Sequence, residues 1–513
     1  MFQTIAVLDY GSQYTGLIVR RLRELRVHSR LYVGAVKAAL LKEERNLAAI
    51  VLSGGGGGGD PEEEAPTCDP GIFNLGIPIL GIGYGAQLMV KALGGEVVAS
   101  DLRENRRAVA RITAKAPLVE GLPEKFDILM NHGDRITGIP PGGIGFLAAA
   151  DCQYAGFFLP DRRFYGLQFH PEVHHTPLGG EILENFLYKI CDCKGDWLMA
   201  DFAAAAIQEV KDKVGEAKAV MGISGGVDST VAAVLLSEAI GDRLTCVFVD
   251  TGLLRKDEFE RVVSRYGNRF SIIGVRAGER FLSALRGVTD PEEKRKTIGR
   301  VFIDVFQEEA RKMPDVQFLG QGTLYPDVIE SVGGYGGAET AVIKSHHNVG
   351  GLPEKMGLKL LEPLRELFKD EVRELGGNLG MPEDELRRHP FPGPGLAVRI
   401  LGEVTAERVA LLQEVDAIVL EEIHAAGWYR KLWQAFAVLL PLKTVGVKGD
   451  RRTYDNLAAL RMVESADGMT ADWAEVPHEF VRRISHRITS EVTGINRVVY
   501  DVTSKPPATI EWE

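Results

Sequence analysis

The sequence predicts an α/β protein built from three domains. Its 513 residues are too many for one hydrophobic core, since domains average about 150 residues. The first half alternates strand-like and amphipathic stretches, and a buried strand, a glycine-rich loop and an apolar helix follow near residue 220. We expect an α/β domain over residues 1–195, a doubly wound parallel sheet over 199–388 and a small α+β domain over 389–513.

In the first expected domain, β-rich runs such as residues 5–8 and 49–52 alternate with amphipathic stretches. This alternation is typical of a parallel sheet with crossover helices. Residues 191–197 are polar and contain glycine, which suits a linker to the next domain.

The rest of the chain begins with a helix-like stretch and the strand that leads into the glycine-rich loop. A second β/α alternation continues to about residue 388, where the sequence His-Pro-Phe-Pro-Gly-Pro-Gly breaks regular structure. The other predicted elements are helices at 202–214, 231–240 and 407–425 and strands at 219–223, 436–440 and 497–502.

Composition favours a soluble, cytoplasmic protein. Hydrophobic residues make up 45% and charged residues 26%, no apolar run is long enough for a membrane span, and no secretory segment opens the chain. The net charge of -11 argues against broad nucleic-acid binding, so any phosphate site must be local. Five cysteines (Cys68, Cys152, Cys191, Cys193 and Cys246) form neither a metal-spaced cluster nor a disulfide framework.

The glycine-rich loop at residues 224–230 carries the strongest chemical signal. Its backbone N–H groups can approach phosphate oxygens, and the following helix directs its positive dipole end at them. We expect Asp228 to help hold Mg²⁺ against a polyphosphate. The loop consists of Ser224, Gly225, Gly226, Val227, Asp228, Ser229 and Thr230.

No lysine follows these glycines, which argues against γ-phosphate transfer. The loop resembles that of the N-type ATP pyrophosphatases. It therefore predicts ATP cleavage to AMP and pyrophosphate with adenylation of a second substrate. A glycine turn without a ligand is the plainer alternative.

Seven separated stretches carry a resemblance to a known family. They cover residues 8–15, 169–173, 224–230, 321–331, 343–353, 388–399 and 503–513. Together they resemble the glutamine-hydrolysing GMP synthetases over essentially the whole chain. The resemblance implies a class I glutamine amidotransferase domain, an ATP pyrophosphatase domain, and a C-terminal domain that forms a homodimer and helps bind xanthosine monophosphate (XMP).

The implied reaction adenylates the C2 oxygen of XMP, and ammonia then displaces AMP to give GMP. The resemblance also implies a mobile lid at residues 343–353. His346 and His347 in that segment could equally be ordinary loop residues. Without the resemblance, Arg295 would be interpreted as part of a solvated helix face, because it lies in a run of charged residues. The resemblance assigns XMP contacts to Arg295, Asp450, Lys505, Ile510 and Glu511.

The first domain departs from the family at the glutamine site. Glutamine hydrolysis needs a thiolate on a G-x-C-x-G elbow, activated by a histidine that a carboxylate orients. Here the elbow reads Gly-Ile-Gly-Tyr-Gly, with Gly83 at the nucleophile position, while His170 and Glu172 are present. Ala86 and the glycines at residues 56–59 are further departures from the family pattern.

We therefore expect glutamine-dependent activity to be lost or severely reduced and ammonia-dependent activity to persist. Neither Cys68 nor Cys152 has a context that would lower its pKa and make it a substitute nucleophile. The alternatives are another ATP pyrophosphatase ligase, such as an NAD synthetase or a tRNA-thiolating enzyme, and a non-catalytic scaffold that kept the fold.

Overall fold

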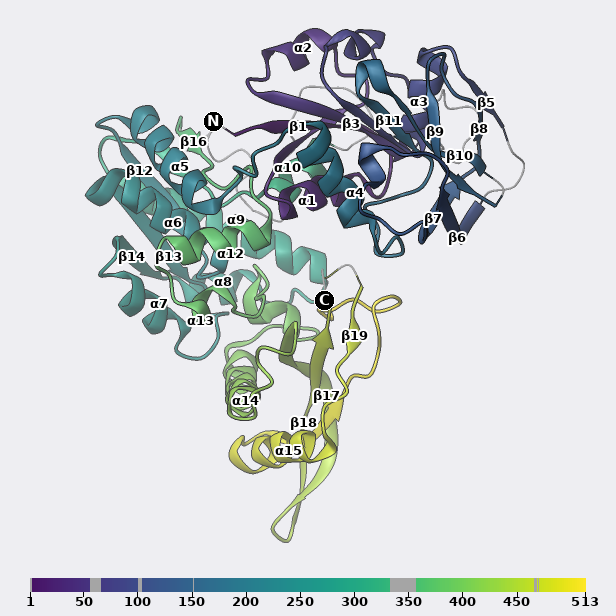
Figure 1. Cartoon of the computed structure of the whole chain (residues 1–513). Helices are drawn as coiled ribbons and strands as arrows, with labels where there is room; N and C mark the ends of the chain where they lie inside the picture. Colours follow the sequence, from purple (N-terminus) through teal and green to yellow (C-terminus); the bar gives the residue numbers. More distant parts are fainter. Residues whose placement is uncertain are drawn as a thin grey trace. The chain divides into compact units, whose positions relative to one another are not determined.

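The computed structural model describes residues 2–55, 66–99, 104–150, 152–332, 357–465, 468 and 470–513. The chain divides into two compact units, Met1–Phe202 and Ala203–Glu513 (Figure 1). The expected lid at 343–353 and the glycines at 56–59 lie outside the described residues. Within these ranges, no helix is both long and apolar enough to cross a membrane.

A nine-stranded sheet forms the centre of the first unit (Figure 1). A separate two-stranded sheet pairs β5 (Glu96–Val98) with β8 (Arg135–Gly138). In spatial order the large sheet contains β2 (His28–Val33), β1 (Thr4–Tyr10), β3 (Leu47–Gly55), β4 (Ile79–Ile82), β11 (Phe164–Leu167), β10 (Cys152–Leu159), β9 (Ile144–Ala149), β6 (Glu104–Ile112) and β7 (Lys125–His132).

The prediction of a parallel sheet is wrong for half of these strands. From β2 to β11 the strands are parallel, but β11, β10, β9, β6 and β7 pair antiparallel in turn. Short connections such as that between β9 and β10 leave no room for a crossover helix, so the strands they join must run antiparallel. The alternation of apolar residues in the sequence does not indicate whether neighbouring strands run parallel or antiparallel.

Helix α3 packs against the parallel half of the sheet, where its Ala86 and Met89 share a core with Ile50, Leu52 and Ile79. The helices of the first unit are α1 (Thr15–Glu24), α2 (Ala38–Glu43), α3 (Tyr84–Ala92) and α4 (Gly179–Asn185), the last continued by a π-helical turn at Phe186–Ile190.

The segment expected to be a linker has no helix or strand, yet it is anchored. Trp197 is buried, and its ring lies 4.9 Å from that of Phe2 and 4.5 Å from that of His28. Cys191 and Cys193 are buried as well. Helix α5 (Met199–Val214) begins directly afterwards.

The second unit contains the predicted doubly wound parallel sheet. Its strands, in spatial order, are β14 (Ser271–Arg276), β13 (Leu244–Asp250), β12 (Lys218–Ile223), β15 (Val316–Gly320) and β16 (Lys359–Leu361), all parallel. Its helices are α6 (Val227–Ile240), α7 (Glu258–Tyr266), α8 (Gly278–Ala284), α9 (Pro291–Arg311), α10 (Tyr325–Val332), α12 (Lys369–Asn378) and α13 (Glu383–Leu386).

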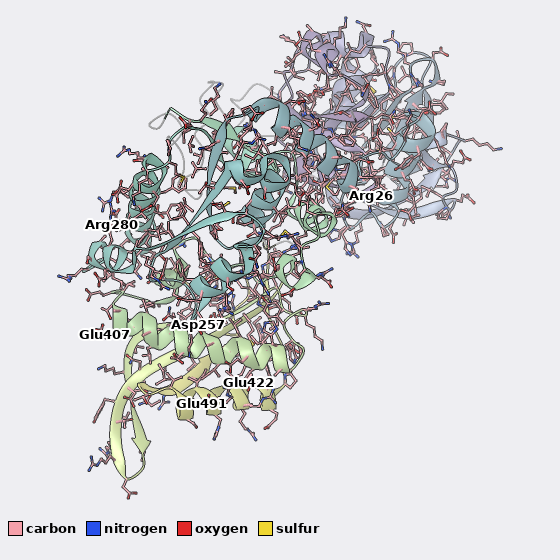
Figure 2. The ribbon with its side chains drawn as sticks, turned by 90° about the vertical axis from the view of Figure 1, so that its left-hand side faces the viewer. Arg26, Asp257, Arg280, Glu407, Glu422 and Glu491 are labelled. Atoms are coloured by element: carbon pink, nitrogen blue, oxygen red, sulfur yellow. The ribbon has the colours of Figure 1, made fainter. Side chains whose placement is uncertain are left out.

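A four-stranded sheet with two helices completes the second unit. Helix α14 (Ala406–Ala425) contacts α15 (His478–Glu491), because Arg487 of α15 donates to Glu422 of α14 at 3.1 Å. Figure 2 labels Glu422 on α14 and Glu491 on α15. The strands are β17 (Gln434–Lys448), β18 (Arg451–Glu464), β19 (Asp472–Trp473) and β20 (Ile495–Tyr500).

The β17–β18 hairpin is much longer than the predicted strand at 436–440. Register is maintained from the pair Gln434 and Val463 to the pair Lys448 and Arg451, with one irregularity between Leu439 and Lys443. Pro441 sits at that irregularity, which explains why the sequence suggested that the strand ends there.

Candidate active sites

Gly83 lies in the turn that connects strand β4 to helix α3. Its φ of +54° and ψ of -113° belong to a conformation that residues with a side chain rarely adopt. A sharp, strained strand-to-helix turn of this kind is what a nucleophile elbow uses to raise its central residue above the sheet. The elbow backbone is therefore present, but its central residue offers no attacking atom.

The two flanking glycines hold this turn close to the sheet. A Cβ on Gly81 would lie 2.7 Å from the backbone nitrogen of Ala86, and one on Gly85 would lie 2.3 Å from the carbonyl oxygen of Leu52. Both positions therefore require glycine for packing, whatever residue occupies the centre of the elbow.

His170 faces the elbow. A Cβ on Gly83 would lie 3.5 Å from Nε2 of His170. On its other side the ring donates Nδ1–H to Oε1 of Glu172 at 2.6 Å, and both side chains are buried. This hydrogen bond assigns the neutral tautomer in which Nε2 is the basic nitrogen. The structure thus brings together all three residues that the sequence assigned to glutamine hydrolysis.

Neighbouring groups fix the histidine and the carboxylate in place. Thr176 donates its hydroxyl to the backbone oxygen of His170 at 2.7 Å, and Arg21 donates Nε–H to that of Glu172 at 3.2 Å. The Tyr14 ring lies 5.3 Å from the His170 ring. A histidine oriented in this way is arranged to take a proton from a group on the elbow.

The cysteines of the first unit lie in settings that do not favour a reactive thiolate. Burial raises the pKa of the Cys68 thiol, and it raises the pKa of Cys193 to about 11. Cys152 is buried at the start of β10, where it donates to Oε1 of Gln168 at 3.8 Å. A raised pKa suppresses the thiolate form on which attack depends.

The glycine-rich loop connects β12 to α6. Helix α6 begins at Val227, four residues earlier than predicted, so residues 227–230 form its first turn. Ser229 draws the loop inward, because its hydroxyl accepts from the backbone nitrogen of Ser224 at 3.2 Å and donates to the carbonyl oxygen of Gly226 at 3.1 Å. Gly225 has a φ of +73°, which a residue with a side chain would adopt only with strain.

Asp228 is the acidic group of this turn. Its Oδ2 lies 3.5 Å from Nζ of Lys369, while Oδ1 is buried without a hydrogen-bond partner among the described residues. A carboxylate with an unpaired oxygen in a glycine-rich turn fits the coordination that Mg²⁺ takes with one carboxylate and substrate phosphates. No group of three or more His, Cys, Asp or Glu side chains in the described ranges could hold a metal by itself.

A cavity of about 220 Å³ opens over the loop. Phe302 and Phe306 of helix α9 stack on each other at 6.4 Å beside it, and the Gln321 side chain lies in its wall. Neither Nε2 nor Oε1 of Gln321 has a hydrogen-bond partner in the described part of the chain. The cavity thus combines an aromatic wall with free polar atoms, as nucleotide sites do.

The C-terminal tail packs into the second unit close to helix α9. Arg295 donates to the backbone oxygen of Glu513 at 2.5 Å, and Ile510 packs beside Phe436. Arg399, which is fully buried, binds both oxygens of Glu511 at 3.0 and 2.8 Å. Arg295, Ile510 and Glu511 are therefore held in one region.

The other two residues assigned to XMP are Lys505 and Asp450. Lys505 donates to the backbone oxygen of Gly468 at 2.7 Å. Asp450 lies in the turn between β17 and β18, at the end of that sheet farthest from the C-terminus (Figure 1). Within a single chain, the structure does not bring Asp450 to the other four residues assigned to XMP.

Three family models match the chain in order. They are Glutamine amidotransferase class-I over residues 6–190, NAD synthase over 200–261 and GMP synthase C terminal domain over 421–512. A "GMP synthase [glutamine-hydrolyzing]" of Phenylobacterium zucineum is 55% identical over 99% of this chain and 98% of its own length. The chain belongs to the glutamine-hydrolysing GMP synthase family.

Other GMP synthases match to a similar extent. That of Carboxydothermus hydrogenoformans is 54% identical over the whole of both chains, and that of Maridesulfovibrio salexigens is 52% identical over 99% of each. As a member of the GMP synthase family, the chain is a ligase, and the three expected kinds of domain are confirmed.

Sequence reasoning missed two residues beside the candidate GMP synthase sites. Lys369 reaches Asp228 across 141 positions, and Arg399 reaches Glu511 across 112. Arg399 is the last residue of the stretch 388–399 that resembles the family, but the sequence assigned it no role. Nothing in the neighbouring sequence distinguishes Lys369 from other charged residues at the start of a helix. Only chain folding reveals either contact.

Proposed function

We propose that the chain converts XMP to GMP through an adenyl-XMP intermediate, using ATP and free ammonia. The observation that carries this proposal is the β12–α6 turn, in which the Ser229 hydroxyl joins the backbone of Ser224 to that of Gly226 at the start of helix α6. The C2 oxygen of XMP attacks the α-phosphorus of ATP and pyrophosphate leaves. Ammonia then adds to C2 and AMP departs with that oxygen.

The loop's part is to hold the leaving pyrophosphate. The positive end of the α6 dipole, at Val227, favours the negative charge that develops on it. Asp228 would hold Mg²⁺ through its unpaired oxygen, and a bound Mg²⁺ would supply further charge neutralisation. Lys369 adds a positive charge on the same side.

For XMP we propose contacts with Arg295, Lys505, Ile510, Glu511 and Asp450. A guanidinium and an ammonium suit the phosphate, and carboxylates suit N–H and O–H donors of the base or ribose. The bidentate bond from Arg399 holds Glu511 in one orientation. Asp450 would have to reach XMP from another copy of the chain or after movement of the hairpin.

We also propose a homodimer formed through the C-terminal sheet. Val445 and Tyr454 face each other across the hairpin, and both are exposed, as is Val447. Exposed apolar side chains on one sheet face are typical of an interface. Sedimentation should give a dimer, and Tyr454→Asp should shift it toward monomer. A monomeric unaltered protein would contradict this.

We propose that Gly83 stands where the family's nucleophilic cysteine would be, and that glutamine-dependent synthesis is lost or severely reduced. The elbow, His170 and Glu172 keep their arrangement but have no sulfur to activate. The domain limits 1–195, 199–388 and 389–513 are likewise proposed.

The test compares two nitrogen donors. GMP formation from XMP and ATP is measured with ammonium chloride and, separately, with glutamine. We expect turnover with ammonium. The rate with glutamine should be at least about 10³-fold lower than the rate with ammonium, because removal of a catalytic nucleophile acts on that scale. Equal rates with both donors would refute the loss of glutaminase, and no GMP with either would refute XMP amination.

A further inference from the structure

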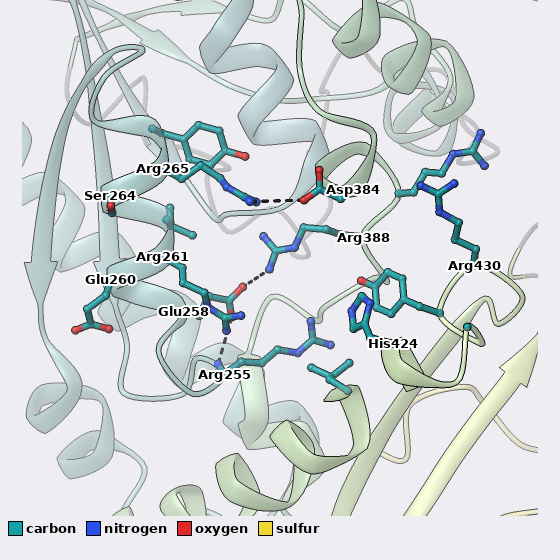
Figure 3. Close-up of a pocket in the computed structure, with 16 residues that line it drawn as sticks. Arg255, Glu258, Glu260, Arg261, Ser264, Arg265, Asp384, Arg388, His424 and Arg430 are labelled. Carbon is teal, nitrogen blue, oxygen red and sulfur yellow. Dashed lines mark hydrogen bonds and ion pairs between the residues drawn. The ribbon is translucent and has the colours of Figure 1, made fainter. Parts of the chain in front are cut away.

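A larger cavity, of about 990 Å³, lies in the second unit and contains none of the residues assigned above to ATP, Mg²⁺ or XMP (Figure 3). Its walls come from helices α7, α13 and α14 and from the turn after α14. The volume is at the upper end of the roughly 300–1,000 Å³ of small-molecule sites. Nothing in the proposed reaction uses it.

The lining is rich in arginine although the protein is acidic. Six of the sixteen lining residues are arginines and three are acidic, whereas the whole chain carries a net charge of -11. Several of these arginines are already paired. Arg388 binds Glu258 at 2.5 Å, and Arg265 lies 3.6 Å from Asp384.

Two arginines keep unused hydrogen-bonding capacity toward the cavity. Arg261 bonds to the backbone oxygens of residues 256 and 257, and no carboxylate partner occurs for it in the described ranges. Arg255 is 6% exposed, and neither its Nε nor its Nη2 has a hydrogen-bond partner among the described residues. Asp416 lies 3.3 Å from Nε but without hydrogen-bond geometry.

A buried guanidinium with unpaired donors is unfavourable. Burial lowers the pKa of Arg255, with the nearby Asp416 acting in the opposite direction. Figure 3 shows the guanidinium groups of Arg255 and Arg388 pointing into the cavity. An oxyanion accepted by Arg255 would supply the missing partners, and a planar guanidinium matches the oxygens of phosphate.

We propose that this cavity binds a phosphorylated small molecule of nucleotide size, with its phosphate between Arg255 and Arg261. The remaining wall is suited to an organic group, because Val262, Leu420 and the ring of Tyr266 line it. Arg388, which lines the cavity, also donates to the carbonyl oxygen of Gly225 at 2.8 Å, so one wall residue contacts the glycine-rich loop.

The test is calorimetric titration of the full chain with AMP, after a non-hydrolysable ATP analogue and Mg²⁺ have filled the loop. Arg261→Gln removes one phosphate donor from an exposed side chain, so the variant should fold. Arg255→Lys keeps a cation near Asp416 but loses the free guanidinium donors. Each should weaken AMP binding roughly tenfold, the scale of one hydrogen bond to a charged group.

Two controls separate this cavity from other sites. Arg280→Gln removes an arginine of helix α8 that pairs with Glu308 outside the cavity (Figure 2), and AMP binding should be unchanged. Lys505→Gln alters the proposed XMP site and should also leave it unchanged. The proposal is overturned if AMP does not bind, if Arg261→Gln binds as well as Arg280→Gln, or if only Lys505→Gln weakens binding.

Discussion

A Cβ atom on Gly83 would lie 3.5 Å from Nε2 of His170, so a side chain one atom longer than alanine can reach the ring. The histidine is already held by its 2.6 Å bond to Glu172. The structure therefore holds the His170–Glu172 pair beside a turn whose central residue has no side chain.

Gly83→Cys should restore measurable glutamine hydrolysis, because the new thiol would adjoin His170. Ammonia release from glutamine is the measurement. Gly83→Ala is the matched control, since it imposes the same backbone strain, about 1–3 kcal/mol of unfolding free energy, without a thiol. Equal ammonia release from the two variants would show that the loss extends beyond residue 83.

Ser229→Ala should weaken ATP binding about tenfold, because it removes the hydroxyl that ties Ser224 to Gly226. Asp228→Asn should chiefly reduce Mg²⁺-dependent pyrophosphate release. Ser237→Ala is the control, because Ser237 lies on the same helix and its hydroxyl donates to the backbone oxygen of Arg269 at 3.1 Å. Unchanged ATP affinity in Ser229→Ala would remove the basis for a phosphate-binding loop.

Arg399→Lys should raise the KM for XMP about tenfold and leave the KM for ATP nearly constant. The lysine keeps the charge but cannot make the bidentate bond that orients Glu511. Steady-state kinetics with each substrate varied provides the readout. A loss of stability with an unchanged KM for XMP would mean that Arg399 only supports the tail.

Stability should fall as pH drops from about 6.5 toward 4, partly because of His389. Burial lowers its pKa from 6.5 to about 4, and its Nε2–H donates to the backbone oxygen of Tyr429 at 2.7 Å. Between these pH values the unfolded chain binds a proton at His389 that the folded protein does not bind. The free energy of unfolding therefore loses up to about 3 kcal/mol at pH 4.

The measurement for His389 is the free energy of unfolding by urea at pH 7 and pH 5. His389→Gln should flatten its pH dependence, and the exposed His478→Gln should not. A slope that is the same in His389→Gln and the unaltered protein would contradict the assignment.

The strand, loop and helix at residues 218–240 could be predicted because their signals are contiguous: a buried apolar run, glycines, and a second apolar run. The antiparallel half of the first sheet could not, since apolar alternation does not encode strand direction. The β17–β18 hairpin was underestimated because Pro441 is tolerated at an irregularity in the ladder.

The amino-acid sequence alone determined the family resemblance, the chemistry of the loop at residues 224–230 and the lack of a side chain at Gly83, because each depends on residues adjacent in the chain. The tertiary structure decided that His170 faces Gly83, that Lys369 approaches Asp228 and that Arg399 binds Glu511. These contacts join residues 87 to 141 positions apart, and only the packing of sheets and helices brings such residues together.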